Sequence, residues 1–366
     1  MQIYVHIPFC KRKCNYCDFC SQTLGVEREY IDALIEEIKI QGQKYGDKVV
    51  DTIYFGGGTP SVLQEGMLKE IVNALELNFN LQTIERSIEG NPESLTINKL
   101  KEYRACGFDR VSMGVQSLDD NVLIKAGRLH NSKTAIEAIN NAMEIFDNVS
   151  VDMMIGLPEQ TMQSAVDTAQ KLVVTGIKHI SCYALILEDG TPLSKSVNDG
   201  VVKLPNEDDC ADTFDEVMKI LSSAGFLRYE VSNFAKCGFE CRHNLGYWHR
   251  SEYLGLGAAA HSLIDNTRFC NVSNVNKYIE SINVLQTKNN NFQIIKNELT
   301  NDEISFEKIM LGLRMTEGIP KSYFSGFEEQ LETYSEYFVT NSNGNIALTK
   351  RGYEIMNTIL CDFIKE

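Results

Sequence analysis

Three cysteines near the amino end of the chain carry the most evident chemistry. Cys10, Cys14 and Cys17 follow a C-x3-C-x2-C spacing. The apolar run at residues 3–7 predicts a strand, which Pro8 ends, so we expect the cysteines on a loop that leaves a strand. Iron–sulfur clusters are usually held by four cysteine thiolates. Three thiolates would hold three irons of a 4Fe-4S cluster and leave the fourth iron free for a small molecule.

Two other interpretations of these cysteines stay open at this point. They could be plain buried thiols, or they could form a zinc knuckle. Zinc usually takes four ligands from paired C-x2–4-C elements, and no second pair lies nearby. Cys20 could nevertheless complete a four-sulfur set.

Apolar, strand-like segments alternate with helical segments through the first half of the chain. The expected strands span residues 3–7, 49–55, 84–89, 110–115, 149–155 and 179–187. The expected helices lie near residues 30–38, 68–75, 96–106, 118–126, 132–145 and 163–174. This alternation predicts an α/β fold with a parallel sheet, an open (β/α)6 partial barrel over residues 1–200.

Glycine and polar residues follow these predicted strands. A glycine run, residues 56–58 followed by Thr59, ends the second strand and lacks the P-loop form. Glu89, Gln116, Arg128 and Asp152 fall at or just beyond other strand ends. Taken singly, each is an ordinary solvated loop residue. Because chemistry gathers at the carboxyl ends of parallel strands, together they could face one cavity. There the carboxylates would bind amino and hydroxyl groups, and the guanidinium would bind a carboxylate.

The second half of the chain has a different pattern. Residues 201–290 predict an α+β extension with a long helix near 214–221, a strand at 228–231 and a small-residue stretch at 253–261. We expect a polar connection with one helix over 264–300, with a linker at 288–291. Residues 291–366 predict a small winged-helix-like domain. It would contain helices at 304–313 and 327–337, a hairpin turning at Asn343-Gly344, and a last helix that Thr349 caps and that runs to residue 363.

The composition of the chain indicates its cellular compartment and excludes some classes of binding partner. The chain has 366 residues, a formal net charge of −15 and a pI near 5.0, which argues against nonspecific nucleic-acid binding. No apolar run reaches the length needed to span a bilayer, and the early strand leaves no room for a signal peptide. Eleven cysteines without a signal peptide predict a reduced, cytoplasmic protein. Peripheral membrane contact stays open.

The cysteine spacing, with Tyr16 before the third cysteine, resembles the signature of the radical S-adenosylmethionine (radical SAM) superfamily. The resemblance implies a 4Fe-4S cluster whose open iron chelates the amino and carboxylate groups of S-adenosyl-L-methionine (SAM). Reductive cleavage of SAM would then yield a 5′-deoxyadenosyl radical, with flavodoxin or ferredoxin as the electron donor.

Local strings narrow this resemblance to the group of oxygen-independent coproporphyrinogen III oxidase and its relatives, the heme chaperones. These strings include Tyr4-x-His6-Ile7-Pro8-Phe9-Cys10, Glu89-Gly90-Asn91-Pro92 and Gly127-Arg128-Leu129-His130. The resemblance implies that Cys10, Cys14 and Cys17 ligate the cluster. It also implies a SAM pocket lined by Tyr4, Gly57, Gly58, Thr59, Glu89, Gln116, Arg128 and Asp152, with Tyr16 touching it.

One string separates the two activities. His243-Asn244-Leu245-Gly246-Tyr247-Trp248 matches the H-N-x-x-Y-W string typical of the chaperones. Histidine is a good axial ligand for heme iron, and Tyr247 and Trp248 offer flat apolar surface. The alternative is a packed loop in which His243 bonds to backbone and Trp248 fills core. Cys241, Tyr247 and His249 compete as iron ligands, and Cys237, Cys241 and His243 could bind another metal.

Two departures count against the oxidase. That enzyme has a further segment before the first strand, which here begins at residue 3, and a fourth cysteine where this chain has Phe19. Cys20 is atypical of both groups. We therefore predict a heme chaperone that delivers heme to acceptor hemoproteins such as cytochromes and contains a SAM-binding cluster. The alternatives are the coproporphyrinogen III oxidase and a radical SAM enzyme acting on another tetrapyrrole, so whether the protein is an enzyme stays open.

Overall fold

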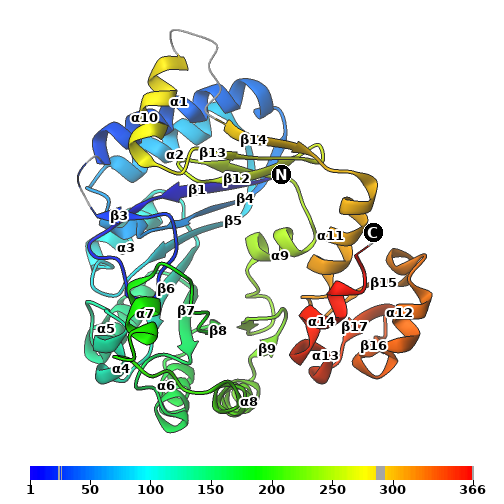
Figure 1. Cartoon of the computed structure of the whole chain (residues 1–366). Coiled ribbons are helices and arrows are strands. Elements are labelled where there is room, and N and C mark those ends of the chain that lie inside the picture. Colours follow the sequence, from blue (N-terminus) through cyan, green and yellow to red (C-terminus); the bar gives the residue numbers. More distant parts are fainter. Residues whose placement is uncertain (24, 26, 286–292, 365–366) are drawn as a thin grey trace.

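The computed structural model describes residues 1–23, 25, 27–285 and 293–364, and Figure 1 shows its arrangement. The six predicted strands are present and lie side by side in parallel, in chain order. They are β1 (Gln2–Ile7), β4 (Val49–Gly57), β5 (Asn80–Gly90), β6 (Arg110–Gln116), β7 (Asn148–Ile155) and β8 (His179–Ala184). The α/β prediction is confirmed. The last strand is shorter than predicted because its neighbour β7 ends at Ile155, which pairs with Ala184.

Six helices follow these strands, as the apolar periodicity predicts. They are α1 (Glu27–Tyr45), α2 (Met67–Asn78), α3 (Ile97–Ala105), α4 (Asp120–Lys125), α5 (Ser132–Met143) and α6 (Met162–Val174). Thr96 caps α3, as predicted, by accepting a hydrogen bond from the backbone N–H of Lys99. The strands are apolar along their length because helices and neighbouring elements cover them, so that Ile3, Val5 and Ile7 are completely buried.

The sheet continues beyond the six strands on both sides. On one side β11 (Tyr253–Leu256) pairs in parallel with β1, and β12 (His261–Ile264), β13 (Thr267–Asn271) and β14 (Gln293–Glu298) follow in antiparallel order. On the other side β8 pairs with β10 (Asn233–Ala235), which pairs with β9 (Leu227–Arg228). The described residues therefore form a sheet of twelve strands.

Two predictions for this region were wrong. Among its described residues the segment 264–300 contains one helix, α10 (Val275–Leu285), as predicted, but it is not otherwise a polar connection, because strands β13 and β14 lie on either side of that helix. The short polar strands of this segment have only a weak sequence pattern, and their conformation depends on pairing with residues distant in the chain. The strand predicted at 228–231 covers only Leu227–Arg228, and Glu230 makes an isolated bridge to Met315. The predicted linker at 288–291 lies outside the described residues.

The C-terminal part has a small core of its own. Ile309, Leu313, Phe324, Phe327 and Phe363 pack together there. Its elements are α11 (Asn301–Gly312), β15 (Ile319–Pro320), a 3-10 turn (Lys321–Phe324), α12 (Glu328–Thr333), β16 (Phe338–Thr340), β17 (Asn345–Leu348), α13 (Lys350–Glu354) and α14 (Met356–Cys361). The hairpin of β16 and β17 is confirmed. The helix predicted at 327–337 is broken into α12 and a 3-10 turn (Ser335–Tyr337), and the helix predicted at 349–363 is broken into α13 and α14. The division into three domains stays a prediction.

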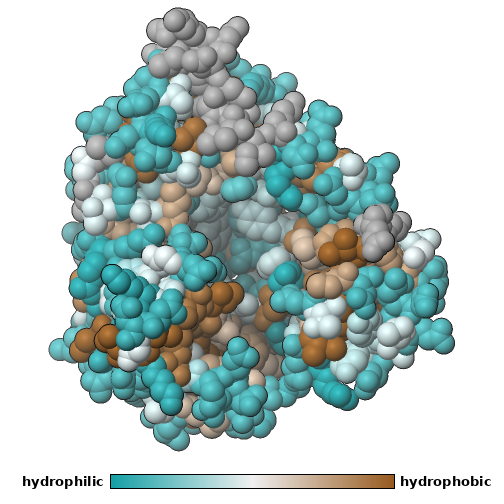
Figure 2. Space-filling model, in the orientation of Figure 1, coloured by the Kyte–Doolittle hydropathy of each residue, from teal (hydrophilic) through white to brown (hydrophobic). Residues whose placement is uncertain are grey.

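Three elements remain between these parts. They are α7 (Pro192–Asn198), α8 (Glu207–Ser223) and α9 (Arg242–Trp248). Figure 1 draws α9 near the centre of the molecule, between the sheet and the C-terminal helices. Figure 2 shows that this face of the protein is hollowed near its centre.

Candidate functional site

The cysteine loop leaves β1 and lies against the end of α4. It begins with β2 (Phe9–Cys10), which pairs with β3 (Gln22–Thr23). The Arg12 guanidinium donates to the carbonyl oxygens of Gly127, at 2.6 Å, and Arg128, at 3.0 Å. The Asn15 side-chain amide donates to the Lys125 carbonyl at 3.0 Å. These contacts fix the loop next to the Gly127-Arg128 turn. The Tyr16 ring anchors it further, in an apolar cluster of Val122, Ala126, Met154 and Leu157.

The three sulfurs of the C-x3-C-x2-C spacing are neighbours in space. Burial raises the pKa of the Cys10 and Cys17 thiols, and each is raised further by the nearby Cys14 sulfur. Cys20 is directed elsewhere, since its Sγ donates to the Ser273 carbonyl at 3.1 Å. Among the described residues, no three His, Cys, Asp or Glu side chains converge on a single ion position. A 4Fe-4S cluster attaches each cysteine to a different iron, so its thiolates need not converge on one ion position.

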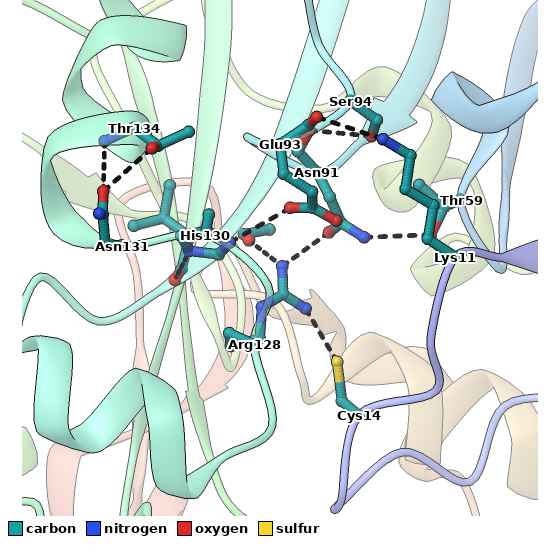
Figure 3. A network of polar contacts seen from close by, with 12 residues as sticks. Lys11, Cys14, Thr59, Asn91, Glu93, Ser94, Arg128, His130, Asn131 and Thr134 are labelled. Atoms are coloured by element: carbon teal, nitrogen blue, oxygen red, sulfur yellow. Dashed lines mark hydrogen bonds and ion pairs between the residues drawn. The ribbon is translucent and has the colours of Figure 1, made fainter.

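A chain of hydrogen bonds links two of these sulfurs, and Figure 3 shows the part of it that runs from Thr59 through Asn91 and Arg128 to Cys14. Thr59 Oγ1 donates to Cys10 Sγ at 3.4 Å, and Asn91 Nδ2 donates to Thr59 Oγ1 at 3.0 Å. Arg128 donates from Nη2 to Asn91 Oδ1 at 2.7 Å and from Nη1 to Cys14 Sγ at 3.2 Å. Arg128 also donates to the Gly114 carbonyl. The chain therefore supplies donors toward both sulfurs, which suits thiolates.

The glycine run packs directly on the cysteine loop. Gly57 has a φ of 107°, in the region that favours glycine. A Cβ on Gly58 would lie 2.8 Å from the Phe9 nitrogen and 2.7 Å from its oxygen, so no larger residue fits without a shift. The run thus holds its backbone close to the cysteines, where it can also face a ligand.

Glu89, a partly buried carboxylate, lies beside the glycine run, and a second one, Asp152, lies close enough to influence it. Glu89 accepts hydrogen bonds from the Tyr54 hydroxyl at 2.7 Å and from the Gly57 N–H at 3.3 Å. Burial nevertheless raises the pKa of Glu89 to about 7, helped by the negative charge of Asp152. Burial also raises the pKa of Asp152, which accepts from Ser112 Oγ at 3.3 Å. A cationic or N–H-bearing ligand would favour the ionised form of both groups.

Two buried polar atoms of the predicted pocket have no partner among the described residues. They are Gln116 Oε1 and Arg128 Nε. Gln116 also has a φ of 68°, a strained conformation for a residue other than glycine. Unpartnered buried atoms are rare in folded proteins and are most readily explained by a ligand or ordered water. An acceptor and a donor are therefore available at the carboxyl ends of the central strands.

A cavity of about 390 Å³ adjoins these residues. Of the predicted SAM residues, Tyr4, Gly57 and Glu89 line this cavity. Tyr4 donates or accepts a hydrogen bond with His6 Nδ1 at 2.9 Å. The remaining lining residues are His6, Phe19, Cys20, Tyr247, Tyr253, Ala259, Ala260 and His261.

The H-N-x-x-Y-W string forms α9, a helix and not a loop. Glu85 holds its start by accepting from the backbone N–H groups of Arg242, at 2.9 Å, and His243, at 3.2 Å. His243 is 1% exposed. Its Nδ1 lies 2.8 Å from Thr52 Oγ1 and its Nε2 lies 3.0 Å from the Tyr247 hydroxyl, so both ring nitrogens are engaged.

The other members of this string differ in their surroundings. Burial lowers the pKa of His243 to about 3, which keeps the ring neutral. Asn244 and Trp248 are half-buried, and the Arg314 guanidinium lies 5.5 Å from the Trp248 ring centre. Tyr247 is the one residue of the string that lines the cavity. The heme contact of His243, Asn244, Tyr247 and Trp248 stays a prediction.

Comparison with known proteins agrees with this geometry. A sequence model of the radical SAM superfamily matches residues 4–172. Over 379 residues the chain is 35% identical to heme chaperone HemW of Bacillus subtilis (strain 168), covering 99% of each protein. It is 31% identical to heme chaperone HemW of Lactococcus lactis subsp. lactis (strain IL1403), covering 99% of this chain and 96% of the relative.

The chain belongs to the heme chaperone HemW family. A structural comparison supports the fold of this radical SAM family. Coproporphyrinogen III oxidase (HemN) from Escherichia coli has a TM-score of 0.84 and 23% sequence identity, covering 100% of this chain and 90% of that one. Among the described residues, no helix is long and apolar enough to cross a membrane.

The HemW family implies a 4Fe-4S cluster and SAM, and the residues present fit both. Three adjacent thiols with donors to two of them suit a cluster, and the unpartnered atoms of Gln116 and Arg128 suit a polar ligand beside it. Sequence reasoning missed the function of Asn91 in joining Thr59 to Arg128. It also missed His261 as a cavity residue. Asn91 belongs to a quoted string and His261 ends the small-residue stretch at 253–261, but only their placement in the fold shows these contacts.

Proposed function

We propose that this protein is a heme chaperone that binds heme and transfers it to hemoproteins such as respiratory cytochromes. The observation that carries the proposal is the full-length similarity to proteins named heme chaperone HemW. The H-N-x-x-Y-W string on α9 supports it further. The coproporphyrinogen III oxidase is similar in fold, and at 23% identity it supports no more than the fold.

We further propose that Cys10, Cys14 and Cys17 hold a 4Fe-4S cluster. When bound, the cluster supplies an electron and one open iron site for the amino and carboxylate groups of SAM. Thr59 and Arg128 donate hydrogen bonds to two of the cysteine sulfurs, which stabilises their thiolate forms. The Tyr16 ring holds the loop between the second and third cysteines in place.

The remaining pocket residues would orient SAM. The Glu89 carboxylate accepts from the amino group, and the Asp152 carboxylate accepts from ribose hydroxyls. Gly57 and Gly58 offer backbone groups, Gln116 offers its unpartnered Oε1, and Arg128 offers its unpartnered Nε to the SAM carboxylate. Tyr4 closes the side of the pocket that faces the cavity.

The proposed partners follow from this function. They are heme or another tetrapyrrole, acceptor hemoproteins, and flavodoxin or ferredoxin if SAM is cleaved. The eleven cysteines all carry free thiols, which supports a cytoplasmic location, and peripheral membrane contact with membrane-bound acceptors stays part of the proposal. The acidic chain offers little to nucleic acid.

The test is anaerobic cluster reconstitution followed by two parallel assays. In one, heme is titrated into the protein and its transfer to an apo-hemoprotein is followed by absorbance. In the other, coproporphyrinogen III is supplied with SAM and a reductant. We expect heme binding and transfer, with no conversion to protoporphyrinogen IX. Failure to bind heme, or SAM-dependent decarboxylation of coproporphyrinogen III, would overturn the proposal.

A further inference from the structure

The histidines of this chain differ sharply in how their rings are engaged. The chain has six. His6 is engaged by the Tyr4 hydroxyl and the Cys20 carbonyl, and His130 by Glu93 and the Val115 carbonyl. His179 is engaged by Ser150 and Tyr229, and His243 by Thr52 and Tyr247. His249 pairs with Glu317 on the surface.

The sixth histidine is His261, the first residue of β12. It is exposed and lines the cavity beside Tyr4 and Glu89. Within the part of the chain that the structure describes, no hydrogen bond to its ring is found. Burial and the nearby Arg268 charge lower the pKa of its imidazole, so the ring is neutral at pH 7. A neutral imidazole with a free nitrogen is the form that ligates heme iron.

The surroundings of His261 suit a flat aromatic ligand. Ala259 and Ala260 beside it have small side chains that leave room in the cavity. Tyr247 and Tyr253 form another part of the lining, with ring centres 4.8 Å apart in an edge-to-face contact. Phe19 also lines the cavity and is 67% exposed. Aromatic rings of this kind offer apolar surface to a porphyrin face.

Two cationic side chains lie near the same cavity. The Lys13 ammonium donates to the Phe19 carbonyl at 3.0 Å, which places a positive charge beside the Phe19 part of the lining. The Arg268 guanidinium, which pairs with Glu307 at 2.8 Å, lies close enough to influence both His261 and Tyr253. Heme carries two propionate carboxylates, and charge-assisted hydrogen bonds from Lys or Arg are the common way to bind such groups.

Cys20 is the competing ligand in this cavity. Its thiol donates to the Ser273 carbonyl at 3.1 Å, and burial raises its pKa, so the thiol form is favoured over the thiolate that would bind iron. His243 is excluded as a ligand in this conformation because both of its ring nitrogens are engaged in the interior.

We propose that His261 is the protein ligand of the heme iron, in the cavity that borders the SAM pocket. The inference rests on the proposed heme-chaperone function and assigns its cargo site. It places the heme against Tyr247, so the H-N-x-x-Y-W helix would contribute a cavity wall while His243 orients the Tyr247 hydroxyl. Cargo and SAM would then occupy adjoining sites, both bordered by Tyr4 and Glu89.

The test is an anaerobic hemin titration of the cluster-loaded full chain, followed by absorbance. His261→Ala should weaken binding at least tenfold and change the spectrum of the bound heme, and added free imidazole should restore the wild-type spectrum. His261→Cys should convert the spectrum to the thiolate-ligated type, which a merely structural function of His261 would not produce. His249→Ala is the matched control, since His249 is also exposed but lies outside the cavity. It should bind as wild type does.

Cluster content and melting temperature, measured for each variant, show that the fold is intact. Unchanged affinity and spectrum in His261→Ala would overturn the assignment, and so would loss of the native spectrum in Cys20→Ser instead. Either result leaves the heme-chaperone function standing, provided the wild-type protein binds heme. If the wild-type protein itself binds no heme, the proposed function fails together with the ligand assignment.

Discussion

Replacing Glu89 by glutamine tests the proposed SAM pocket at a carboxyl group whose pKa lies near neutral pH. Glu89 accepts from the Tyr54 hydroxyl and the Gly57 N–H, yet burial raises the pKa of its carboxyl from 4.5 to about 7. An ionised Glu89 can accept an N–H of the SAM amino group. Hydrogen bonds to charged groups contribute about 1.5–3 kcal/mol, so Glu89→Gln should weaken SAM binding about 10- to 100-fold.

The same pKa predicts how the affinity depends on pH. For a carboxyl with a pKa of about 7, the ionised form is dominant at pH 8 and scarce at pH 6. Ionising it at pH 6 costs about 1.4 kcal/mol, or a factor of about ten in affinity. SAM affinity should therefore fall as pH falls through 7. Between pH 8 and pH 6 the loss of affinity should be about ten times larger in wild type than in Glu89→Gln. Deprotonation of the SAM amino group itself affects both proteins alike.

The assay is calorimetric titration of SAM into anaerobically reconstituted protein at pH 6, 7 and 8. Glu70→Gln is the matched control, because Glu70 is exposed and pairs with Arg28 on the surface, and it should bind SAM as wild type does. Equal SAM affinity in wild type and Glu89→Gln, with the same pH dependence, would refute the placement of Glu89 in the SAM pocket.

Three further predictions concern stability. His243→Ala should lower the free energy of unfolding by about 2–4 kcal/mol, since it leaves Thr52 and Tyr247 without their shared partner; urea unfolding measures this. Glu37, whose pKa burial raises to about 7, binds its proton more tightly in the folded state, so its contribution to stability should fall by about 3 kcal/mol as pH rises from 4.5 to 7 and stay level above; in melts at several pH values, Glu37→Gln should remove this contribution and leave the similar one of Glu89. Glu307→Ala should cost about 3 kcal/mol in urea unfolding, because it removes the carboxylate that pairs with both the largely buried Arg250 and Arg268.

Each of these has a clear contrary result. Unchanged stability in His243→Ala would mean that the paired ring is not part of the core. A flat profile for wild type between pH 4.5 and 7 would contradict the raised pKa of Glu37. If Glu307→Ala unfolds at the wild-type urea concentration, the ion pair between α11 and the segment before β11 contributes nothing measurable.

The parts of the site that depend on local pattern could be predicted from sequence. The cysteine spacing predicted the loop that leaves β1, and apolar strands ending near Glu89 and Gln116 placed these two residues at one edge of the sheet, whereas Asp152 lies inside β7. The rule that parallel strands present their carboxyl ends together makes that step reliable. It needs no knowledge of contacts between distant residues.

The rest depends on contacts across long stretches of chain. β11 lies beside β1 although some 250 residues separate them, and no local signal encodes that pairing. From the sequence, His243 could be an exposed metal ligand. Its contacts with the distant Thr52 and with Tyr247, one helical turn away, show that it is buried. Likewise, only the fold places Asn91 between Thr59 and Arg128, and only the fold places His261 in the lining of the cavity.

The measurement that tests the central claim most directly is metal analysis of anaerobically reconstituted protein, with and without single cysteine-to-alanine changes. The account predicts a zinc-free chain with a 4Fe-4S cluster, lost in Cys10→Ala, Cys14→Ala and Cys17→Ala but retained in Cys20→Ala. It also predicts that SAM alters the electron paramagnetic resonance spectrum of the reduced cluster. Zinc at these cysteines, or loss of iron in Cys20→Ala equal to that in Cys14→Ala, would contradict it.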